Sequence, residues 1–308
     1  MQSGVDAMKS RRLLRTLLVD FLFAVVLVVP IIVIQHGVEP FRRGFFCNDE
    51  SLRYPLRPDT ISSTVLLLLS LVFPLLLIVV VELLAWFCGT EAGKKRPLLA
   101  HWSSPSWLAE CCKQCFYYVI GYVLAIDVQE VGKCTLGRLR PHFMAVCQPQ
   151  LLDGSSCGDP GTANRYIEDY VCVASGYSAT MVRQTRLSFP SGHTLMTTFA
   201  MVYLTLYLQS RMKWRGSHLA VHVFQAMLLM TAYYVGLTRI SDYWHHCSDV
   251  VAGALIGGGV ALLTAIYVTK MFASTASGSG EQRDLKLQQQ QTSVDVLQVV
   301  ATTLEQHR

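Results

Sequence analysis

Charged residues are scarce in this sequence. Aspartate, glutamate, lysine and arginine account for 15% of its 308 residues, whereas a typical soluble domain contains about 25%. Hydrophobic residues account for 52%. The composition therefore argues against a soluble globular protein and favours a chain that lies largely within a lipid bilayer.

Signals for nucleic acid, zinc and glycan are also missing. The formal net charge is +5, but the basic residues are scattered over the loops and form no basic helix or aromatic-interleaved patch. No cysteine pair with zinc-ligand spacing is followed by a second pair. Asparagine occurs only at positions 48 and 164, neither of them in an N-x-Ser/Thr sequence. We therefore expect no nucleic-acid partner, no zinc site and no N-linked glycan.

Long hydrophobic runs make up much of the chain. A transmembrane helix needs about 20 apolar residues, and its backbone polar groups must be satisfied within the helix. Four strong candidate spans occur at residues 17–34, 61–87, 219–237 and 250–268. Two weaker ones occur at residues 116–131, which include two acidic residues, and 194–208, which include several threonines. We predict an all-α polytopic membrane protein with six transmembrane helices.

Basic residues in the loops predict the orientation. They concentrate in the N-terminal segment and in the second and fourth loops, which we therefore place in the cytoplasm: Lys9, Arg11, Arg12, Arg15, Lys94, Lys95, Arg96, Lys113, Arg211, Lys213 and Arg215. The third loop is basic on the opposite side, against this rule, which suggests another role for its cations.

We divide the chain into a cytoplasmic N-terminus (1–15), a six-span domain (16–270) and a cytoplasmic tail (271–308), whose Gly/Ser and glutamine runs predict disorder.

Cysteines are frequent in the predicted extracytoplasmic loops. Cys147, Cys157 and Cys172 share the large third loop, on the side of the membrane where disulfides persist. We expect one disulfide among these three residues, and the sequence leaves the pairing open.

The first of three polar clusters, KCTLGRLRP at residues 133–141, follows the third span. Lys133 supplies a point charge and Arg140 a planar bidentate donor, a combination that suits a phosphate group. We expect Glu130, three residues before Lys133, to pair with it and hold it in place. Basic residues also flank most membrane spans, so the alternative is a purely structural role.

The second cluster, SFPSGHT at residues 188–194, directly precedes the fourth span. Ser191 is a natural N-cap, and Gly192 lets a ligand approach the backbone closely. His193 then falls in the first turn of a helix, whose unpaired amides and positive dipole end suit an anion. The alternative is an ordinary helix cap beside an exposed histidine.

The third cluster joins the fifth and sixth spans. Arg239 ends the fifth span, and His245 and Asp249 lie four residues apart at the start of the sixth. Residues i and i+4 share one face of a helix, so we predict that the Asp249 carboxylate accepts the Nδ1 proton of His245. The Nε2 atom is then free to act as nucleophile or base. A structural or pH-sensing histidine–aspartate pair is the alternative.

All three clusters are expected at one face of the membrane, because the third and fifth loops both lie opposite the N-terminus. Together they provide three cations, two histidines, a carboxylate and a helix N-terminus. Such a set suits phosphoryl transfer without an evident metal site.

KCTLGRLRP, PSGH and TRISDYWHHCSD resemble the three signature motifs of the phosphatidic acid phosphatase type 2 superfamily, and most of all those of the animal lipid phosphate phosphatases. The resemblance covers about residues 15–270, and the combined spacing K-x6-RP, PSGH and R-x5-H-x3-D is specific, whereas no single motif is. One departure is Thr238, where the family often has serine. The resemblance implies a six-span, haloperoxidase-like helical core and no cofactor, Mg²⁺ included.

The resemblance also implies a role for each site residue. His245 is the nucleophile that forms a phosphohistidine, and Asp249 orients it. His193 protonates the leaving alkoxide and then activates the water that hydrolyses the intermediate. The implied phosphate-binding residues are Lys133, Arg140, Ser191, Gly192 and Arg239.

The implied substrates are lipid phosphate monoesters: phosphatidate, lysophosphatidate, sphingosine 1-phosphate or ceramide 1-phosphate. The resemblance further implies a multi-pass plasma-membrane protein that self-associates as a homo-oligomer, with its site facing outside or the lumen and its termini in the cytoplasm. Three alternatives are a non-enzymatic relative that binds lipid phosphates, a phosphatase of sugar phosphates or polyprenyl diphosphates, and a transporter or channel. The last is disfavoured because the fourth to sixth spans are too apolar to line a polar pathway.

Overall fold

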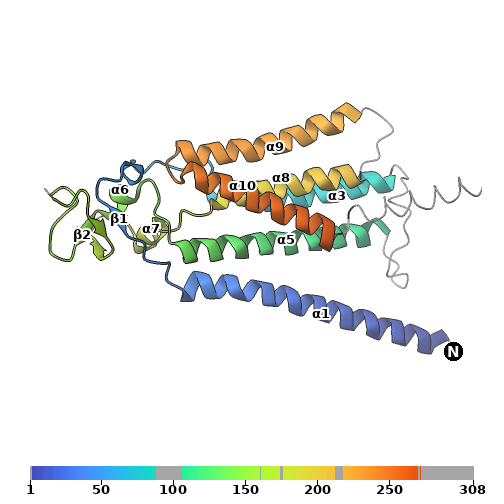
Figure 1. Ribbon diagram of the computed structural model, residues 1–308. Coiled ribbons are helices and arrows are strands. Elements are labelled where there is room, and N and C mark those ends of the chain that lie inside the picture. The colour runs from blue at the N-terminus through green and yellow to red at the C-terminus, as the bar shows by residue number, and fades with distance from the viewer. Residues whose placement is uncertain are drawn as a thin grey trace, which may run out of the picture.

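The computed structural model describes residues 2–87, 106–159, 161–173, 176–211, 218–269 and 271. In these ranges, long helices form an elongated bundle, and short strands and helices form a cap at the end opposite the N-terminus (Figure 1). The bundle consists of α1 (Gln2–Gly37), α2 (Ser63–Leu67), α3 (Phe73–Phe87), α5 (Ser106–Leu136), α8 (Gly192–Arg211), α9 (His218–Ser241) and α10 (Cys247–Leu263). Two π-helical turns, η2 (Leu68–Val72) and η3 (Thr264–Val268), join α2 to α3 and extend α10.

Five helical stretches in the described ranges are long and apolar enough to cross a membrane: Leu18–Gly37, Ser63–Phe87, Trp107–Leu136, Leu219–Ser241 and Cys247–Val268. They correspond to five of the six predicted spans. The sixth, α8, has 20 residues and falls outside this group, and most of its side chains are buried by other helices. Because α8 is shielded in this way, its threonines need not face lipid. The predicted all-α polytopic fold is confirmed.

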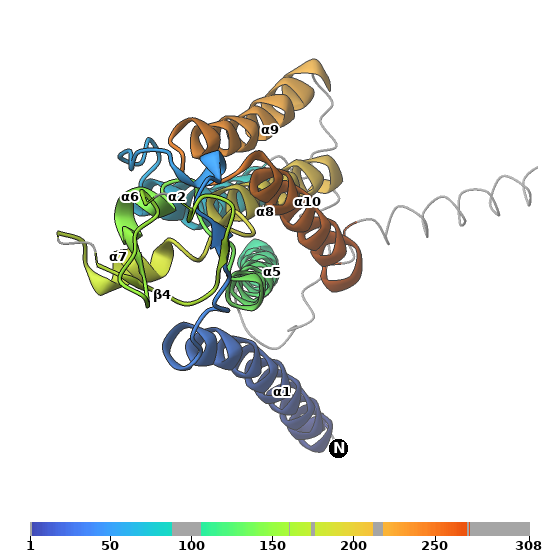
Figure 2. The same ribbon diagram turned by 60° about the vertical axis from the view of Figure 1, so that its left-hand side comes forward.

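Helix α8 forms the centre of the bundle. It packs against α5, α9 and α10, and Figure 2 shows it enclosed by these helices. Leu195, Phe199, Tyr203 and Tyr207 are completely buried along its length. This packing fixes the axis of α8, and with it the position of the PSGH segment at its first turn.

Helix α10 approaches α8 closely because two of its glycines face that helix. A Cβ atom at Gly257 would lie 2.2 Å from the carbonyl oxygen of Leu195, and one at Gly253 would lie 2.7 Å from that of Ser191. Small residues spaced four apart let membrane helices pack backbone to backbone. The contact brings the first turn of α10 beside the first turn of α8.

The cap is built from the first and third loops. Its elements are β1 (Phe45–Phe46), the 3₁₀ turn η1 (Glu50–Leu52), α6 (Phe143–Cys147), β2 (Pro149–Leu151), β3 (Tyr166–Ile167), β4 (Tyr170–Cys172) and α7 (Ala179–Gln184). Strand β1 pairs antiparallel with β3, and β2 pairs antiparallel with β4. Phe45 of the first loop packs edge-on against Phe143 and Tyr170 of the third.

Two disulfides stabilise the cap. Cys147–Cys172 is the bridge expected within the third loop, whereas Cys47–Cys157 joins the third loop to the first. The second bridge was not predicted, because nothing in the sequence shows that the first loop folds onto the third. The two loops therefore form one covalently linked unit above the helices.

Several predicted features lie outside the described residues. They are the basic residues Lys94, Lys95, Arg96, Lys213 and Arg215, and the tail from residue 272 onward. Helix α1 is continuous from Gln2 to Gly37, so the boundary predicted at residue 15 falls inside a helix. It lies along α5 at one side of the bundle (Figures 1 and 2).

Candidate active site

The three clusters lie side by side at the capped end of the bundle. Lys133 is in the last turn of α5, and Ser191 immediately precedes α8. Arg239 is in the last turn of α9, His245 lies in the short connection that follows, and Asp249 is in the first turn of α10. The ends of four helices therefore supply the site, and the packing of those helices determines its geometry.

Lys133 forms the ion pair predicted for it. Its Nζ atom lies 3.1 Å from Oε1 of Glu130, one turn earlier in α5. The same carboxylate oxygen accepts a hydrogen bond of 2.9 Å from Nε2 of Gln129. Glu130 thus holds the ammonium group in place and leaves its other two donor hydrogens for further acceptors.

Arg140 is buried beneath the cap, with 8% of its surface exposed. Its guanidinium lies 4.8 Å from the ring centroid of Trp244, and its Nη2 contacts the carbonyl oxygen of Leu187 at 3.4 Å. Burial lowers the pKa of Arg140 to about 10; the Asp59 charge opposes this lowering and the Arg239 charge adds to it. Its Nε atom is buried without a hydrogen-bond partner in the described structure. A buried cationic donor of this kind favours an anionic ligand.

The start of α8 is packed tightly on both sides. The backbone N–H of Ser191 donates to the carbonyl oxygen of Asp249 at 3.1 Å, and its hydroxyl accepts a hydrogen bond of 3.0 Å from Thr194. A Cβ atom at Gly192 would lie 2.6 Å from Oε1 of Gln129. We expected Gly192 to leave space for a ligand, whereas the side chain of Gln129 in α5 occupies this space. The Gln129 oxygen is buried without a partner in the described structure.

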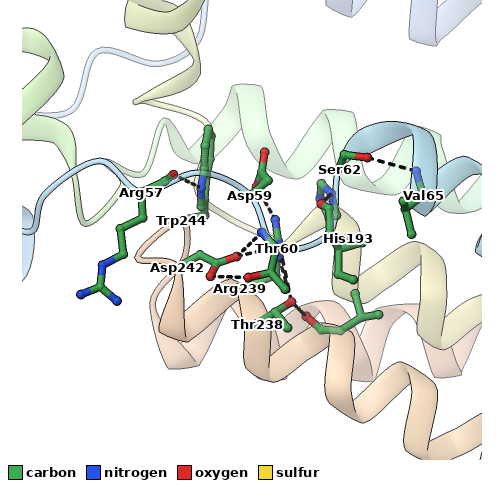
Figure 3. A network of polar contacts seen from close by, with 12 residues as sticks. Arg57, Asp59, Thr60, Ser62, Val65, His193, Thr238, Arg239, Asp242 and Trp244 are labelled. Atoms are coloured by element: carbon green, nitrogen blue, oxygen red, sulfur yellow. Dashed lines mark hydrogen bonds and ion pairs between the residues drawn. The ribbon is translucent and has the colours of Figure 1, made fainter.

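His193 lies in the first turn of α8 and points toward the segment that precedes α2 (Figure 3). Its Nε2 atom lies 3.1 Å from the carbonyl oxygen of Ile61. A carbonyl can only accept, so Nε2 carries a hydrogen in this arrangement. The predicted proton donor therefore holds its proton at the edge of the site.

Arg239 is the most deeply buried cation of the site, with 1% of its side chain exposed. Its Nη1 atom lies 2.5 Å from Oδ1 of Asp59, and its Nη2 atom lies 3.0 Å from Oδ2 of Asp242 (Figure 3). Neither carboxylate was predicted to belong to the site. Asp242 is one turn after Arg239 at the end of α9, and Asp59 comes from the first loop.

His245 is buried and electrically neutral. Burial lowers the pKa of His245 well below 6.5, and the charges of Arg140 and Lys133 lower it further, whereas the hydrogen bond to the Ser188 carbonyl acts in the opposite direction. Its Nδ1 atom lies 2.7 Å from the carbonyl oxygen of Ser188. In a neutral imidazole with Nδ1 donating to a carbonyl, Nε2 must hold the lone pair. The geometry therefore leaves Nε2 of His245 with a free lone pair.

Asp249 does not hydrogen-bond His245, contrary to our prediction. Its Oδ2 atom lies 4.0 Å from Nδ1 of His245, beyond hydrogen-bonding distance. The prediction assumed that both residues lie on one helix, but α10 begins at Cys247, two residues after His245. Oδ2 instead accepts hydrogen bonds from the Ser188 hydroxyl at 2.6 Å and from the backbone N–H of His246 at 3.1 Å.

Arg138 is a further residue that the sequence reasoning missed. Its Nη1 atom donates to Oδ1 of Asp249 at 2.6 Å and to the hydroxyl of Ser248 at 2.8 Å. Arg138 and Ser188 both lie within the polar clusters of the sequence, so their positions could have identified them as site residues. Asp59 lies outside these clusters, and no sequence pattern pointed to it. Within the described residues, no group of three or more His, Cys, Asp or Glu side chains is arranged to hold a metal ion.

Comparisons with known proteins agree on one family. Residues 114–272 match the PAP2 superfamily. A Drosophila melanogaster protein named "Putative phosphatidate phosphatase" is 43% identical over 268 residues, 85% of this chain and 71% of that protein. Phospholipid phosphatase 1 of Rattus norvegicus is 36% identical over 83% of this chain and 86% of its own length. Phospholipid phosphatase 2 of Mus musculus is 35% identical over 83% of this chain and 87% of its own length.

No solved structure matches the chain. The region that matches the family contains every predicted site residue, from Lys133 to Asp249. It covers about half of the chain, and the relatives align over most of the rest as well. Together with the apolar helices, these findings show that the chain is a multi-pass membrane phosphatase and belongs to the PAP2 superfamily.

Proposed function

We propose that the protein is a metal-independent lipid phosphate phosphatase that hydrolyses the monoesters phosphatidate, lysophosphatidate, sphingosine 1-phosphate or ceramide 1-phosphate. The observation that carries the proposal is the state of His245, which is buried, neutral and held through Nδ1 by Ser188. The names of its relatives, phosphatidate phosphatase and phospholipid phosphatase, support a lipid substrate.

In the first step, Nε2 of His245 attacks phosphorus, a nitrogen–phosphorus bond forms, and the bond to the lipid alkoxide breaks. His193 enters the step as an imidazolium and donates its Nε2 proton to that alkoxide, so that the lipid leaves as an alcohol and His193 is left neutral. The proton has to be released from Ile61, whose carbonyl oxygen lies 3.1 Å away. His245 is left as a phosphohistidine, and its Nδ1–H remains bonded to Ser188.

In the second step, water attacks the phosphorus of the phosphohistidine. His193, now neutral, accepts a proton from this water, and the nitrogen–phosphorus bond breaks. Inorganic phosphate leaves, and both histidines return to their starting protonation states. The cycle consumes one water and needs no redox partner.

Three cations stabilise the charge that develops on the phosphoryl oxygens. Lys133 acts as a point charge, whereas Arg140 and Arg239 offer planar forks that match two oxygens at once. The Ser191 hydroxyl and the Gly192 amide add neutral donors at the N-terminus of α8. Because burial removes water from Arg140 and Arg239, their attraction for the phosphate is stronger than in solvent.

We further propose that the capped end of the bundle faces the outside or the lumen, in the plasma membrane. Both disulfides lie at this end, and disulfides persist in oxidising compartments. In this orientation a lipid of the outer leaflet keeps its chains in the bilayer and presents its phosphate to the site. Cytoplasmic termini and self-association into a homo-oligomer stay predictions.

The test is phosphate release from phosphatidate in detergent micelles with excess EDTA. We expect the wild type to release phosphate and His245→Ala to release none, because the nucleophile is lost. His222→Ala is the matched control, since His222 contacts Gln225 in α9 and takes no part in the proposed site. Transient labelling of the wild type by radioactive phosphate, acid-labile and missing in His245→Ala, identifies the phosphohistidine.

Activity that EDTA abolishes would contradict the metal-independent mechanism. Full activity of His245→Ala would contradict its role as nucleophile. If the wild type releases phosphate from none of the four lipids, the proposed substrates are wrong and the protein is a phosphatase of a different ester.

A further inference from the structure

Residues 57–61, which we call the strap, lie against the site just before α2 (Figure 3). The indole N–H of Trp244 donates to the carbonyl oxygen of Arg57 at 3.1 Å. Thr60 donates from its backbone N–H and from its hydroxyl to the two carboxylate oxygens of Asp242, each at 2.8 Å. These contacts attach the strap to the end of α9 on both sides of Asp59.

Asp59 is the residue of the strap that reaches the phosphate-binding cations. Its carboxylate pairs with Arg239 at 2.5 Å, and 30% of its side chain is exposed. Its charge also raises the pKa of Arg140, against the larger lowering by burial. Asp59 thus places an anion where the proposed mechanism places a substrate phosphate.

We propose that Asp59 is an internal competitor that keeps weakly bound phosphodiester lipids off Arg239, whereas phosphate monoesters bind strongly enough through their higher charge to displace it. This inference rests on the proposed function and deepens it, because it assigns headgroup selection to the same site. In this scheme Asp59 sets the affinity that a headgroup needs in order to bind, and it takes no part in bond breaking.

The argument depends on charge. A phosphate monoester carries about −1.5 to −2 charges near pH 7, whereas a phosphodiester carries only one. A diester that displaces Asp59 exchanges one negative charge for another at Arg239 and gains no Coulombic attraction. It also competes with a carboxylate that the strap holds at high effective concentration. A monoester brings more charge to three cations and displaces the carboxylate.

The membrane makes such a filter useful. Anionic phosphodiester lipids are abundant in biological bilayers, and a site that takes headgroups from the bilayer meets them constantly. Three unopposed cations next to the membrane surface would hold these lipids as unproductive ligands. While the Asp59 carboxylate is paired with Arg239, it neutralises part of the positive charge that would otherwise bind a diester.

The rival interpretation is that Asp59 only holds Arg239 in position. Both interpretations expect a changed activity when Asp59 is replaced, but they differ in the direction in which the affinity for anionic lipids changes. An internal competitor weakens every ligand that must displace it, so its removal lowers both the Ki of a diester and the KM of a monoester. Loss of a purely structural contact weakens both ligands and raises both constants.

The test compares the wild type with Asp59→Asn in mixed micelles of phosphatidate and phosphatidylmethanol. Phosphatidylmethanol is the methyl diester of the substrate and serves as the inhibitor. Asparagine keeps the size of the side chain and removes its charge. We expect the Ki of phosphatidylmethanol to fall by about tenfold, and the KM of phosphatidate to fall by a similar factor, because both ligands have to displace the same carboxylate.

Two variants control the test. Glu50→Gln removes a charge from an exposed position of the same loop, and we expect it to leave both constants unchanged. Asp59→Glu keeps the charge and is expected to restore both constants of the wild type. An unchanged or higher Ki in Asp59→Asn would overturn the proposal. Asp59→Ser repeats the measurement if the asparagine variant does not fold.

Failure of the proposed function is measured separately, by phosphate release from the wild type. If the wild type releases no phosphate, binding of phosphatidylmethanol is followed as an increase in Tm, because a ligand that binds only the folded state stabilises it. A Tm increase that is equal in the wild type and Asp59→Asn overturns the inference. A larger increase in Asp59→Asn supports it without any reference to catalysis.

Discussion

Arg138, Asp249 and Ser188 form a chain of contacts that ends at His245. Arg138 binds one oxygen of Asp249, and the Ser188 hydroxyl binds the other. The backbone N–H of Ser188 also donates to the carbonyl oxygen of Arg138 at 3.0 Å. The carbonyl that orients His245 therefore belongs to a residue fixed at its main chain and at its side chain. Misplacing a reacting group by about 1 Å can cost about a hundredfold in rate.

Replacing Arg138 by alanine tests this chain of contacts. The loss of a hydrogen bond to a charged group costs about 1.5 to 3 kcal/mol, which corresponds to about a ten- to hundredfold lower kcat. We expect KM to change little, because Arg138 acts through Asp249 and Ser188 and does not bind the phosphate. Steady-state kinetics on phosphatidate separate the two constants.

Arg165→Ala is the control for this experiment, because Arg165 is 63% exposed and pairs with an exposed aspartate. A higher KM with an unchanged kcat in Arg138→Ala would show instead that Arg138 binds the substrate. A substrate could reach the side chain of Arg138, because 30% of it is exposed.

At the scale of elements, the contact between α5 and α8 determines what the first turn of α8 tolerates. Gln129 of α5 packs against Gly192, and the same side chain donates to Glu130, the partner of Lys133. The two helices are thus joined at the site through the backbone of one glycine. This contact gives a structural reason for the glycine that is independent of any ligand.

Gly192→Ala is expected to lower activity strongly, because its Cβ atom would lie 2.6 Å from Oε1 of Gln129. Overpacking of this kind costs about 1 to 3 kcal/mol. The double variant Gly192→Ala/Gln129→Ala removes the clashing amide and should recover part of the lost activity and Tm. Gln129→Ala alone is the reference for the double variant. No recovery would mean that the ligand itself requires the glycine.

Much of the helical framework follows from hydropathy, because a membrane span must be a long apolar helix. Helix α8 gives a weaker signal, since its burial by other helices removes the need for a lipid-facing surface. The start of α10 was misjudged for a different reason. Hydropathy does not locate the first residue of a helix, and a shift of two residues changed the partner of Asp249 from His245 to Ser188.

At the scale of the molecule, Cys47–Cys157 joins two loops that are 110 residues apart in the sequence. Removing a native disulfide typically costs about 2 to 5 kcal/mol. We expect Cys47→Ser and Cys157→Ser to lower Tm by the same amount and the double variant to add nothing, because all three break one bond. Thermal unfolding in detergent measures this effect. Cys247→Ser is the control, since Cys247 is an exposed free cysteine.

Additive losses from the two single variants would show that each cysteine acts independently of the bridge.

The motifs predicted which residues meet at the site, because each lies at the end of a span and odd loops share one side. They did not predict Asp59, because a lone aspartate in a connecting loop has no distinguishing pattern. Its role depends on how the first loop folds across the bundle, which is a property of the tertiary structure.

The origin of the strap has a consequence for how such a protein changes over evolutionary time. All the groups proposed to act on phosphorus lie within residues 114–272, the part that matches the family. Asp59 lies upstream of this part and reaches Arg239 across the fold. Under the two proposals, the reacting groups and the residue that controls headgroup affinity are therefore encoded in separate parts of the sequence. A substitution at residue 59 is then expected to change how tightly lipids bind while the reacting groups stay the same.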